Sequence, residues 1–311
     1  MNIKKIGLTA LAGALVSVSA NAADLSVTGS ASINFAGEEQ QNTGNGWTMG
    51  TGVTFAASAE MDNGWVVSTS QVLNNDRAAE AIDNTTLTID MGDAGTLNFY
   101  GDNGSSAVSA MDDTTPTAGE ESWDDVTGAD GHVGGATASD MFLYSNSSLM
   151  DGVTVKFAYV PSDGPTNIES SFDYTVTYTG IENLTIGAGA GENNKLGSAA
   201  SYDMTVLNAT YTYDAFSIGW STNEADSNAA SSDKTLTAVG ISYAVNDDVS
   251  ISLNSSETEI EGGTDQEAFG ISASMVVGSM TISANHNSVE NIAGTAGDDR
   301  SGYNLNLAFA F

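Results

Sequence analysis

The sequence predicts an all-β protein, specifically a transmembrane antiparallel up-and-down β-barrel of about sixteen strands. Three observations support this fold class. Short turn signals recur along the chain at a nearly constant interval, the segments between them alternate apolar and polar residues, and aromatic residues gather at the ends of the apolar faces. One interval is much longer than the others. We therefore expect short periplasmic turns at one end of the barrel and, at the other, extracellular loops that include a long third loop.

The turn signals repeat every 31 to 33 residues, with a single exception. Successive spacings between their centres are 31, 58, 31, 32, 33 and 31 residues, and 33 more residues lead to the last residue. A unit of this length holds two strands and a loop, so eight units give sixteen strands, counted to within two. The centres are Asp62, Asp93, Asp151, Glu182, Asp214, Asp247 and Gly278.

The segments between turns have the period of two that is typical of half-buried strands. In the last segment every second residue from Tyr303 to Phe311 is large and apolar, and the residues between them are Asn or Ala. Charged residues within the predicted strands, namely Asp90, Lys156 and Asp173, fall on the polar phase. A soluble β-sandwich would also alternate. Uncharged apolar faces, terminal aromatic residues and polar faces of Ser, Thr, Gly and Asn favour a membrane barrel with an open lumen.

The same phase assigns individual positions to lipid or lumen. Leu253 and Val176 lie near the middle of apolar faces, so we expect them to contact lipid. Asn254 lies on the polar face, where even an arginine is expected to be tolerated.

Residues 1–22 have the features of a secretory signal peptide. Lys4 and Lys5 precede an uncharged, largely apolar stretch at residues 6–18, and Ala20 and Ala22 form a cleavage site of the A-x-A type. Residues 23–311 would then form the mature barrel. An N-terminal membrane anchor is the alternative, but it requires a longer apolar run.

The balance of charge and the absence of cysteine exclude several classes of function. The chain has 40 acidic and 7 basic residues, with a formal net charge of −33. Because such a surface repels phosphate backbones, we predict no nucleic-acid partner. No cysteine is present, which rules out disulfides, thiolate metal sites and cysteine nucleophiles.

The two ends of the predicted barrel and its first turn resemble those of the general porins of Gram-negative bacteria. The similarity lies in the first strand from Leu25 to Ala31, the turn from Met61 to Trp65, and the alternating C-terminal strand that ends in Phe311. The resemblance implies a homotrimer of sixteen-stranded barrels in the cell outer membrane, in contact with lipid and lipopolysaccharide. It also implies that the barrel-assembly machinery recognises the C-terminal strand, with Tyr303, Phe309 and Phe311 as the signal.

A further implication of the resemblance is that the third loop folds into the pore as its constriction. The long interval places this loop at residues 102–138, between the fifth and sixth strands. Two features depart from the family pattern. The Pro-Glu-Phe-Gly-Gly-Asp loop motif is absent, the nearest material being Gly119 to Asp125, and no arginine cluster is available to face the loop.

The predicted constriction loop is acidic and contains no Lys or Arg. One interpretation is a ring of negative charge that selects cations, with Lys156 as its lone positive partner. The alternative is that these acids keep a surface loop soluble and that Lys156 simply faces water. The candidate acids of the constriction are Asp112, Asp113, Glu120, Glu121, Asp124 and Asp125, and Asp102 and Asp130 flank them.

Lys234 and Arg300, together with Arg77 and Lys195, are expected in outer loops, where they would form modest surface ion pairs with acids.

The sequence contains no recognisable catalytic or metal-binding motif. His132 and His286 are far apart, with no identifiable partners, so we predict no catalytic residues and no enzymatic activity. No EF-hand loop is present, and we predict no metal site and no cofactor beyond weak association of Ca²⁺ or Mg²⁺ with the acidic loops.

The function that these observations favour is a passive, cation-selective diffusion channel for small hydrophilic solutes and ions. The alternative is a non-channel outer-membrane barrel, or a secreted acidic β protein, with an adhesive or structural role.

Overall fold

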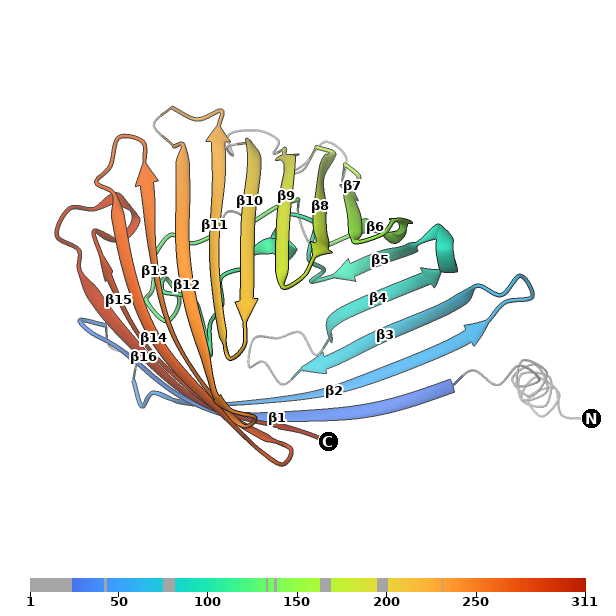
Figure 1. Ribbon diagram of the computed structural model, residues 1–311, viewed down its shortest axis with the longest axis horizontal. Coiled ribbons are helices and arrows are strands. Elements are labelled where there is room, and N and C mark those ends of the chain that lie inside the picture. The colour runs from blue at the N-terminus through green and yellow to red at the C-terminus, as the bar shows by residue number, and fades with distance from the viewer. Residues whose placement is uncertain are drawn as a thin grey trace, which may run out of the picture.

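The chain folds into a closed β-barrel. The computed structural model describes residues 24–41, 44–74, 82–132, 134–136, 139–162, 169–194, 201–230 and 232–311, so the signal peptide predicted for residues 1–22 lies outside the described residues. Within these ranges sixteen strands form one closed sheet, which confirms the predicted fold class (Figure 1). The same ranges contain no helix that is long and apolar enough to cross a bilayer.

The strand boundaries follow the predicted hairpin pattern. They are β1 (Asp24–Glu38), β2 (Trp47–Glu60), β3 (Val66–Asn74), β4 (Ile82–Asp90), β5 (Thr96–Asp102), β6 (Met141–Met150), β7 (Val153–Val160), β8 (Ser171–Ile181), β9 (Leu184–Asn193), β10 (Tyr202–Tyr213), β11 (Phe216–Ser227), β12 (Lys234–Asn246), β13 (Val249–Ile260), β14 (Gln266–Val277), β15 (Met280–Glu290) and β16 (Arg300–Ala310).

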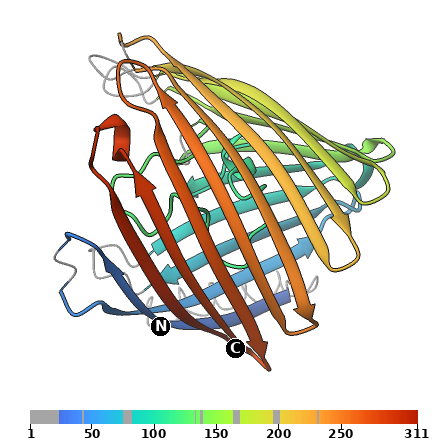
Figure 2. The same cartoon turned by 60° about the vertical axis from the view of Figure 1, so that its left-hand side comes forward.

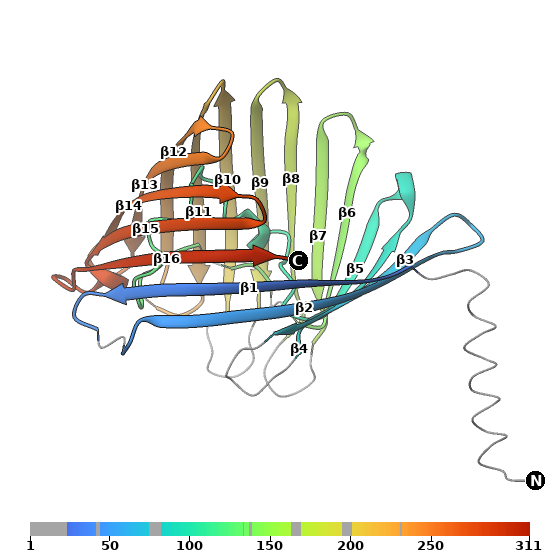
Figure 3. The same ribbon diagram turned by 90° about the horizontal axis from the view of Figure 1, so that it is seen from below.

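Every strand pairs antiparallel with its neighbours in sequence, and β1 pairs with β16 to close the barrel. Figures 2 and 3 show this up-and-down order and the long, tilted strands. The last residue takes part in closure, because the Phe311 N–H donates to the Gly29 carbonyl at 2.8 Å and the Gly29 N–H donates to the Phe311 carbonyl at 3.1 Å. With all strand edges paired in this way, the backbone is suited to a bilayer.

The outer face of the barrel carries the apolar residues. Leu253 and Val176 are 45% and 43% exposed on this face. Aromatic rings contact one another near the strand ends, with ring centroids 4.7 Å apart for Phe35 and Trp47 and 4.6 Å apart for Phe216 and Tyr243. The polar phase faces the lumen as predicted.

The outer face is not free of charge along its whole height, so the prediction of uncharged apolar faces is wrong at the loop ends of several strands. Asp203 lies opposite Asp226 in the pairing of β10 with β11, and Glu267 lies between Glu257 and Glu290 on β13 to β15. These strands have 11 or 12 residues, and a bilayer needs only about 9–11. Their loop ends therefore extend beyond the apolar belt.

Candidate functional site

The long connection between β5 and β6 turns into the barrel and crosses its interior. Because β5 ends at Asp102 and β6 begins at Met141, the connection runs over residues 103–140, between the fifth and sixth strands as predicted. Figure 2 shows this segment, in green, inside the wall of strands. We call the described part of residues 103–140 the constriction loop.

The two ends of the loop are held by one buried carboxylate on β8. Asp173 is 0% exposed, and its Oδ1 and Oδ2 accept hydrogen bonds from the backbone N–H groups of Val108 at 3.1 Å and Ala136 at 2.8 Å. Asn193, on the adjacent strand β9, donates from Nδ2 to the Gly135 carbonyl at 2.8 Å. Hydrogen bonds to a charged acceptor are stronger than neutral ones. Asp173 therefore fastens the beginning of the loop to its end.

The loop next passes β10 to β12 at close range. Thr210 donates from its hydroxyl to the Thr114 carbonyl at 2.9 Å. A Cβ placed on Gly219 would lie 2.4 Å from Pro116 Cδ, and one placed on Gly240 would lie 2.8 Å from the Pro116 carbonyl oxygen. Glycine is therefore required at both wall positions for the loop to pack this closely.

Asparagine and serine side chains hold the middle of the loop against β13 to β15. Asn287 donates from Nδ2 to the carbonyls of Glu121 and Asp124, both at 2.8 Å, and Asn254 donates to the Glu120 carbonyl at 3.2 Å. These bonds satisfy loop backbone groups that would otherwise be buried without partners.

The far end of the loop is secured by two basic residues that were expected in outer loops. Lys234 begins β12 and forms an ion pair with Asp130, with 2.5 Å between Nζ and Oδ1. Arg300 begins β16, is 8% exposed, pairs with Glu38 of β1 and donates to the Thr127 carbonyl at 2.8 Å. Both residues pair with acids as expected, but the expected position in outer loops is wrong, and Arg300 is buried rather than at the surface. The strands begin earlier than the charge pattern suggested, and both side chains fall on the lumen phase.

Arg77 and Lys195 lie outside the described residues.

Small apolar clusters between loop and wall replace a single core. Trp123 packs with Leu236 and Ala238, and Val126 packs with Ala268 and Val289. Two further clusters contain Val108 and Met111, and Ala107 and Ala136, each with wall residues. The loop is thus packed along the wall rather than suspended in the lumen.

The predicted constriction acids differ in burial and charge. Glu121 is 3% exposed, and burial together with the charges of Asp113 and Asp124 raises its carboxyl pKa to about 9, so it is largely protonated at pH 7. Glu120 is exposed, although partial burial and then Asp125 raise its pKa. The predicted ring of charge is therefore incomplete at neutral pH.

Two other acids titrate close to neutrality. Burial, followed by the charge of Asp113, raises the pKa of Asp112 to about 6. Burial, followed by the charge of Glu120, raises the pKa of Asp124 to about 6. Burial lowers the pKa of His132, whose Nε2 lies 3.2 Å from the Val108 carbonyl oxygen, so this histidine is a neutral part of the loop packing.

The loop leaves part of the lumen open. A cavity of about 410 Å³ lies between Glu120 and the side of the barrel formed by β1, β2, the end of β3, β15 and β16. Its lining is otherwise neutral, and the polar groups comprise Ser32, Asn34, Thr48, Asn74, Ser283, Asn285, Asn304 and Asn306. Glu120 supplies the negative charge in this lining.

Lys156 of β7 lies on the lumen phase, as predicted, opposite Ser145 of β6. It forms no ion pair with an acid in the described part of the chain. The structure therefore does not join Lys156 to the constriction acids.

The sequence did not single out the wall residues that hold the loop. Phase assigns Asp173 and Asn254 to the lumen without indicating that they hold the loop, and Asn285 and Asn287 were not singled out. A usable signal was the concentration of Asn at alternate positions of the last strands, since Asn offers both donors and acceptors to a neighbouring backbone.

A family model described as Gram-negative porin matches residues 7–311. The chain belongs to this family. No curated protein sequence matches the porin significantly.

The fold of this porin is similar to that of solved porins. One is an anion-selective porin from Comamonas acidovorans, with a TM-score of 0.72, 12% identity, and coverage of 93% of this chain and 100% of that one. The trimer form of OmpT from Vibrio cholerae has a TM-score of 0.70 at 13% identity, with coverage of 93% and 100%. OmpF of Salmonella typhi in complex with daunomycin has a TM-score of 0.70 at 11% identity, with coverage of 94% and 99%.

Proposed function

We propose that this porin is a passive diffusion channel of the outer membrane, without enzymatic activity, that passes small hydrophilic solutes and ions and selects cations. The observation that carries the proposal is the acidic constriction loop, packed inside the barrel, which presents Glu120 to an open cavity whose lining is otherwise neutral. Unpaired carboxylates in a narrow pore raise the local cation concentration and repel anions.

The anion-selective relative does not decide the sign of selectivity, because at 12% identity it shares the fold alone. Selectivity depends on the charges that line each pore. In the described part of this chain, Lys234 and Arg300 are paired with acids, and Lys156 lies on β7, outside the lining of the open cavity. Glu120 lines that cavity without an ion pair.

The test is conductance across a planar bilayer, with the reversal potential measured in a KCl gradient. We expect the sign of the reversal potential to show that K⁺ crosses more readily than Cl⁻. The potential should be large in dilute salt and smaller near 1 M, where the Debye length falls to about 3 Å. A non-selective or anion-selective pore would overturn the proposal. Absence of any conductance would favour a non-channel barrel or an adhesive surface protein.

Neutralising two sets of acids locates the source of selectivity. The first variant replaces four loop acids by the corresponding amides, at Glu120, Glu121, Asp124 and Asp125. The second replaces three acids that lie on β13 or directly after it, namely Glu257, Glu259 and Glu261, by Gln. The first variant should lose more cation selectivity than the second. Equal reductions would assign selectivity to the acidic loop side of the whole barrel.

We propose that the apolar belt lies in outer-membrane lipid. An arginine at a lipid-facing position costs about 2–4 kcal/mol at mid-membrane. Leu253→Arg should therefore destabilise the porin in lipid vesicles, whereas Asn34→Arg, which faces the open cavity, should not. Equal stability of the two variants in a denaturant titration would exclude this placement.

The same proposal includes a homotrimer in contact with lipopolysaccharide. The relative described as a trimer form supports the oligomer, and native mass spectrometry of the detergent-extracted protein tests it. The acid pairs at the loop ends of β10 to β15 would repel lipopolysaccharide phosphates unless divalent cations lie between them. Lipopolysaccharide that remains bound during purification should therefore dissociate when divalent cations are chelated.

We also propose that Tyr303, Phe309 and Phe311 form the signal read by the barrel-assembly machinery. Phe311 completes the closure between β1 and β16. Deleting it should reduce the amount of assembled, heat-modifiable porin in the outer membrane, and unchanged assembly would exclude this role.

A further inference from the structure

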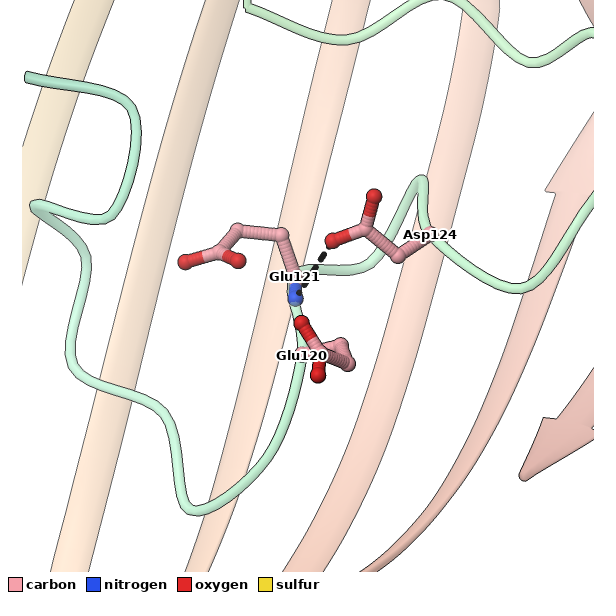
Figure 4. Close-up of side chains that lie close together, drawn as sticks. All are labelled: Glu120, Glu121 and Asp124. Atoms are coloured by element: carbon pink, nitrogen blue, oxygen red, sulfur yellow. Dashed lines mark hydrogen bonds between the residues drawn. The ribbon is translucent and has the colours of Figure 1, made fainter. Parts of the chain in front are cut away.

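Three carboxylates converge in the middle of the constriction loop. One oxygen from each of Glu120, Glu121 and Asp124 lies within 4.8 Å of the others (Figure 4). The turn that gathers them is held by a hydrogen bond from the Glu121 N–H to Asp124 Oδ2 at 3.1 Å. Carboxylates this close repel one another unless protons or a cation lie among them.

The burial of Glu121 is a second and independent observation. Its side chain is 97% buried, and Oε1 has no hydrogen-bond partner in the described part of the chain. A buried acceptor without a partner costs about 1–3 kcal/mol. Donors are close by, but Asn287 bonds the backbone carbonyls of Glu121 and Asp124 instead of this carboxylate. The fold therefore leaves a buried oxygen without a donor beside two other carboxylates.

The kind and number of the donors favour calcium. Oxygen donors suit hard cations such as Ca²⁺ and Mg²⁺. Mg²⁺ usually keeps several of its waters and binds through only one or two carboxylates, whereas Ca²⁺ takes six to eight oxygens in a flexible geometry. Three carboxylates whose oxygens lie within 4.8 Å of one another therefore suit Ca²⁺ better. Glu120, which lines the open cavity, provides the route of entry and room for water ligands.

We propose that Glu120, Glu121 and Asp124 bind one divalent cation of calcium size and that the bound cation lowers the cation selectivity of the pore. The second half of this statement rests on the proposed channel function, and the first half does not. A divalent cation at this position offsets the negative charge that Glu120 presents to the lumen.

Binding is tested by calorimetric titration of the detergent-solubilised, chelator-treated porin with CaCl₂. The variant Glu121→Gln, Asp124→Asn should bind Ca²⁺ at least about tenfold more weakly than the wild type. The matched control, Glu257→Gln with Glu259→Gln, removes the same number of carboxyl groups from the outer face of β13 and should bind as the wild type does. Equal weakening in both variants would mean diffuse attraction to acidic surface and would overturn the site.

Two further arms keep the test decisive. Glu120→Gln changes an exposed side chain, so it should fold and still weaken Ca²⁺ binding, even if the double variant does not assemble. MgCl₂ should bind more weakly than CaCl₂ to the wild type. Magnesium binding as tight as calcium binding would contradict a calcium-sized site.

The effect on selectivity is tested in the planar bilayer. About 1 mM CaCl₂ should shrink the reversal potential of the wild type more than about 3 mM NaCl, which has the same ionic strength, and the double variant should respond equally to both salts. A cation-selective pore that binds no calcium would remove the cation site and leave the channel function intact. Calcium binding without conductance would remove the channel function and leave the site.

Discussion

The two sides of the lumen are built from similar residues but have different roles. On β13 and β15, Asn254 and Asn287 are at most 6% exposed and bond the constriction loop. On β1, Ser32 and Asn34 line the open cavity that faces Glu120. Both sets lie on the polar phase of their strands. The comparison shows that a lumen-facing asparagine can serve as a loop anchor or as a pore lining, and that composition does not distinguish the two.

The geometry also shows why the loop packs against one side. Glycines stand at the closest approaches, as at Gly219 and Gly240, and buried apolar residues such as Leu236 and Ala238 meet the loop between them. The opposite side offers Ser, Thr and Asn side chains to water. A segment with large residues such as Trp123 therefore has its apolar surface buried on one side only.

The largest expected effect comes from removing the anchor of the loop. Asp173→Ala deletes two hydrogen bonds to a buried carboxylate, each worth about 1.5–3 kcal/mol. The loop should detach at both ends, which should increase single-channel conductance and current noise. Thr177→Ala, on the same strand and facing the lumen nearer the turn, is the control and should leave both unchanged. Unaltered conductance in Asp173→Ala would show that the anchor does not hold the constriction.

Equivalent arginine substitutions on the two sides should have different consequences. Asn254→Arg, expected from phase alone to be harmless, places a large side chain at a position that is 6% exposed beneath the loop. Overpacking typically costs about 1–3 kcal/mol, in addition to the lost hydrogen bond. Asn34→Arg should fold normally and lower the cation selectivity. Denaturant titrations and reversal potentials of both variants measure the difference, and identical behaviour would abolish the distinction between the two sides.

Selectivity should depend on pH because two loop acids titrate near neutrality. The pKa of Asp112 and of Asp124 is raised to about 6, so these carboxyls are charged above that pH and neutral below it. With a chelator present, the cation selectivity should decline as pH falls from about 7 to 5. The double variant Asp112→Asn, Asp124→Asn should flatten this part of the profile. A wild-type profile without an inflection near pH 6 would exclude these acids as its source.

The last prediction concerns Glu121, whose effect appears in the pH dependence of stability and not in conductance. Its folded-state pKa of about 9 lies above the ordinary value of 4.5, so the folded state retains a proton that the unfolded chain loses as pH rises. The wild type should therefore lose stability between about pH 4.5 and 9, at a limiting slope of about 1.4 kcal/mol per pH unit. Glu121→Gln, measured without divalent cations, should be stabilised relative to the wild type at pH 8 and not at pH 4. A stability difference that does not change with pH would contradict this assignment.

Much of the architecture follows from the sequence alone. The hairpin period gives the strand count because each turn must return the chain across the same thickness, and the period of two assigns each strand residue to one face. The one long interval locates the constriction loop between the fifth and sixth strands. These features are local, so they are present in the order of residues before any long-range contact forms.

Contacts between distant segments determined the rest. Lys234 and Arg300 bond loop residues 104 and 173 positions away, and Asn287 bonds Glu121 166 positions away. Phase assigns each of these wall residues to the lumen, but it does not say which lumen positions a folded-in loop will cover. The burial of Glu121 and its protonation at neutral pH depend on which wall positions the loop covers. They arise because the loop displaces water from one side of the barrel, which is a property of the tertiary packing.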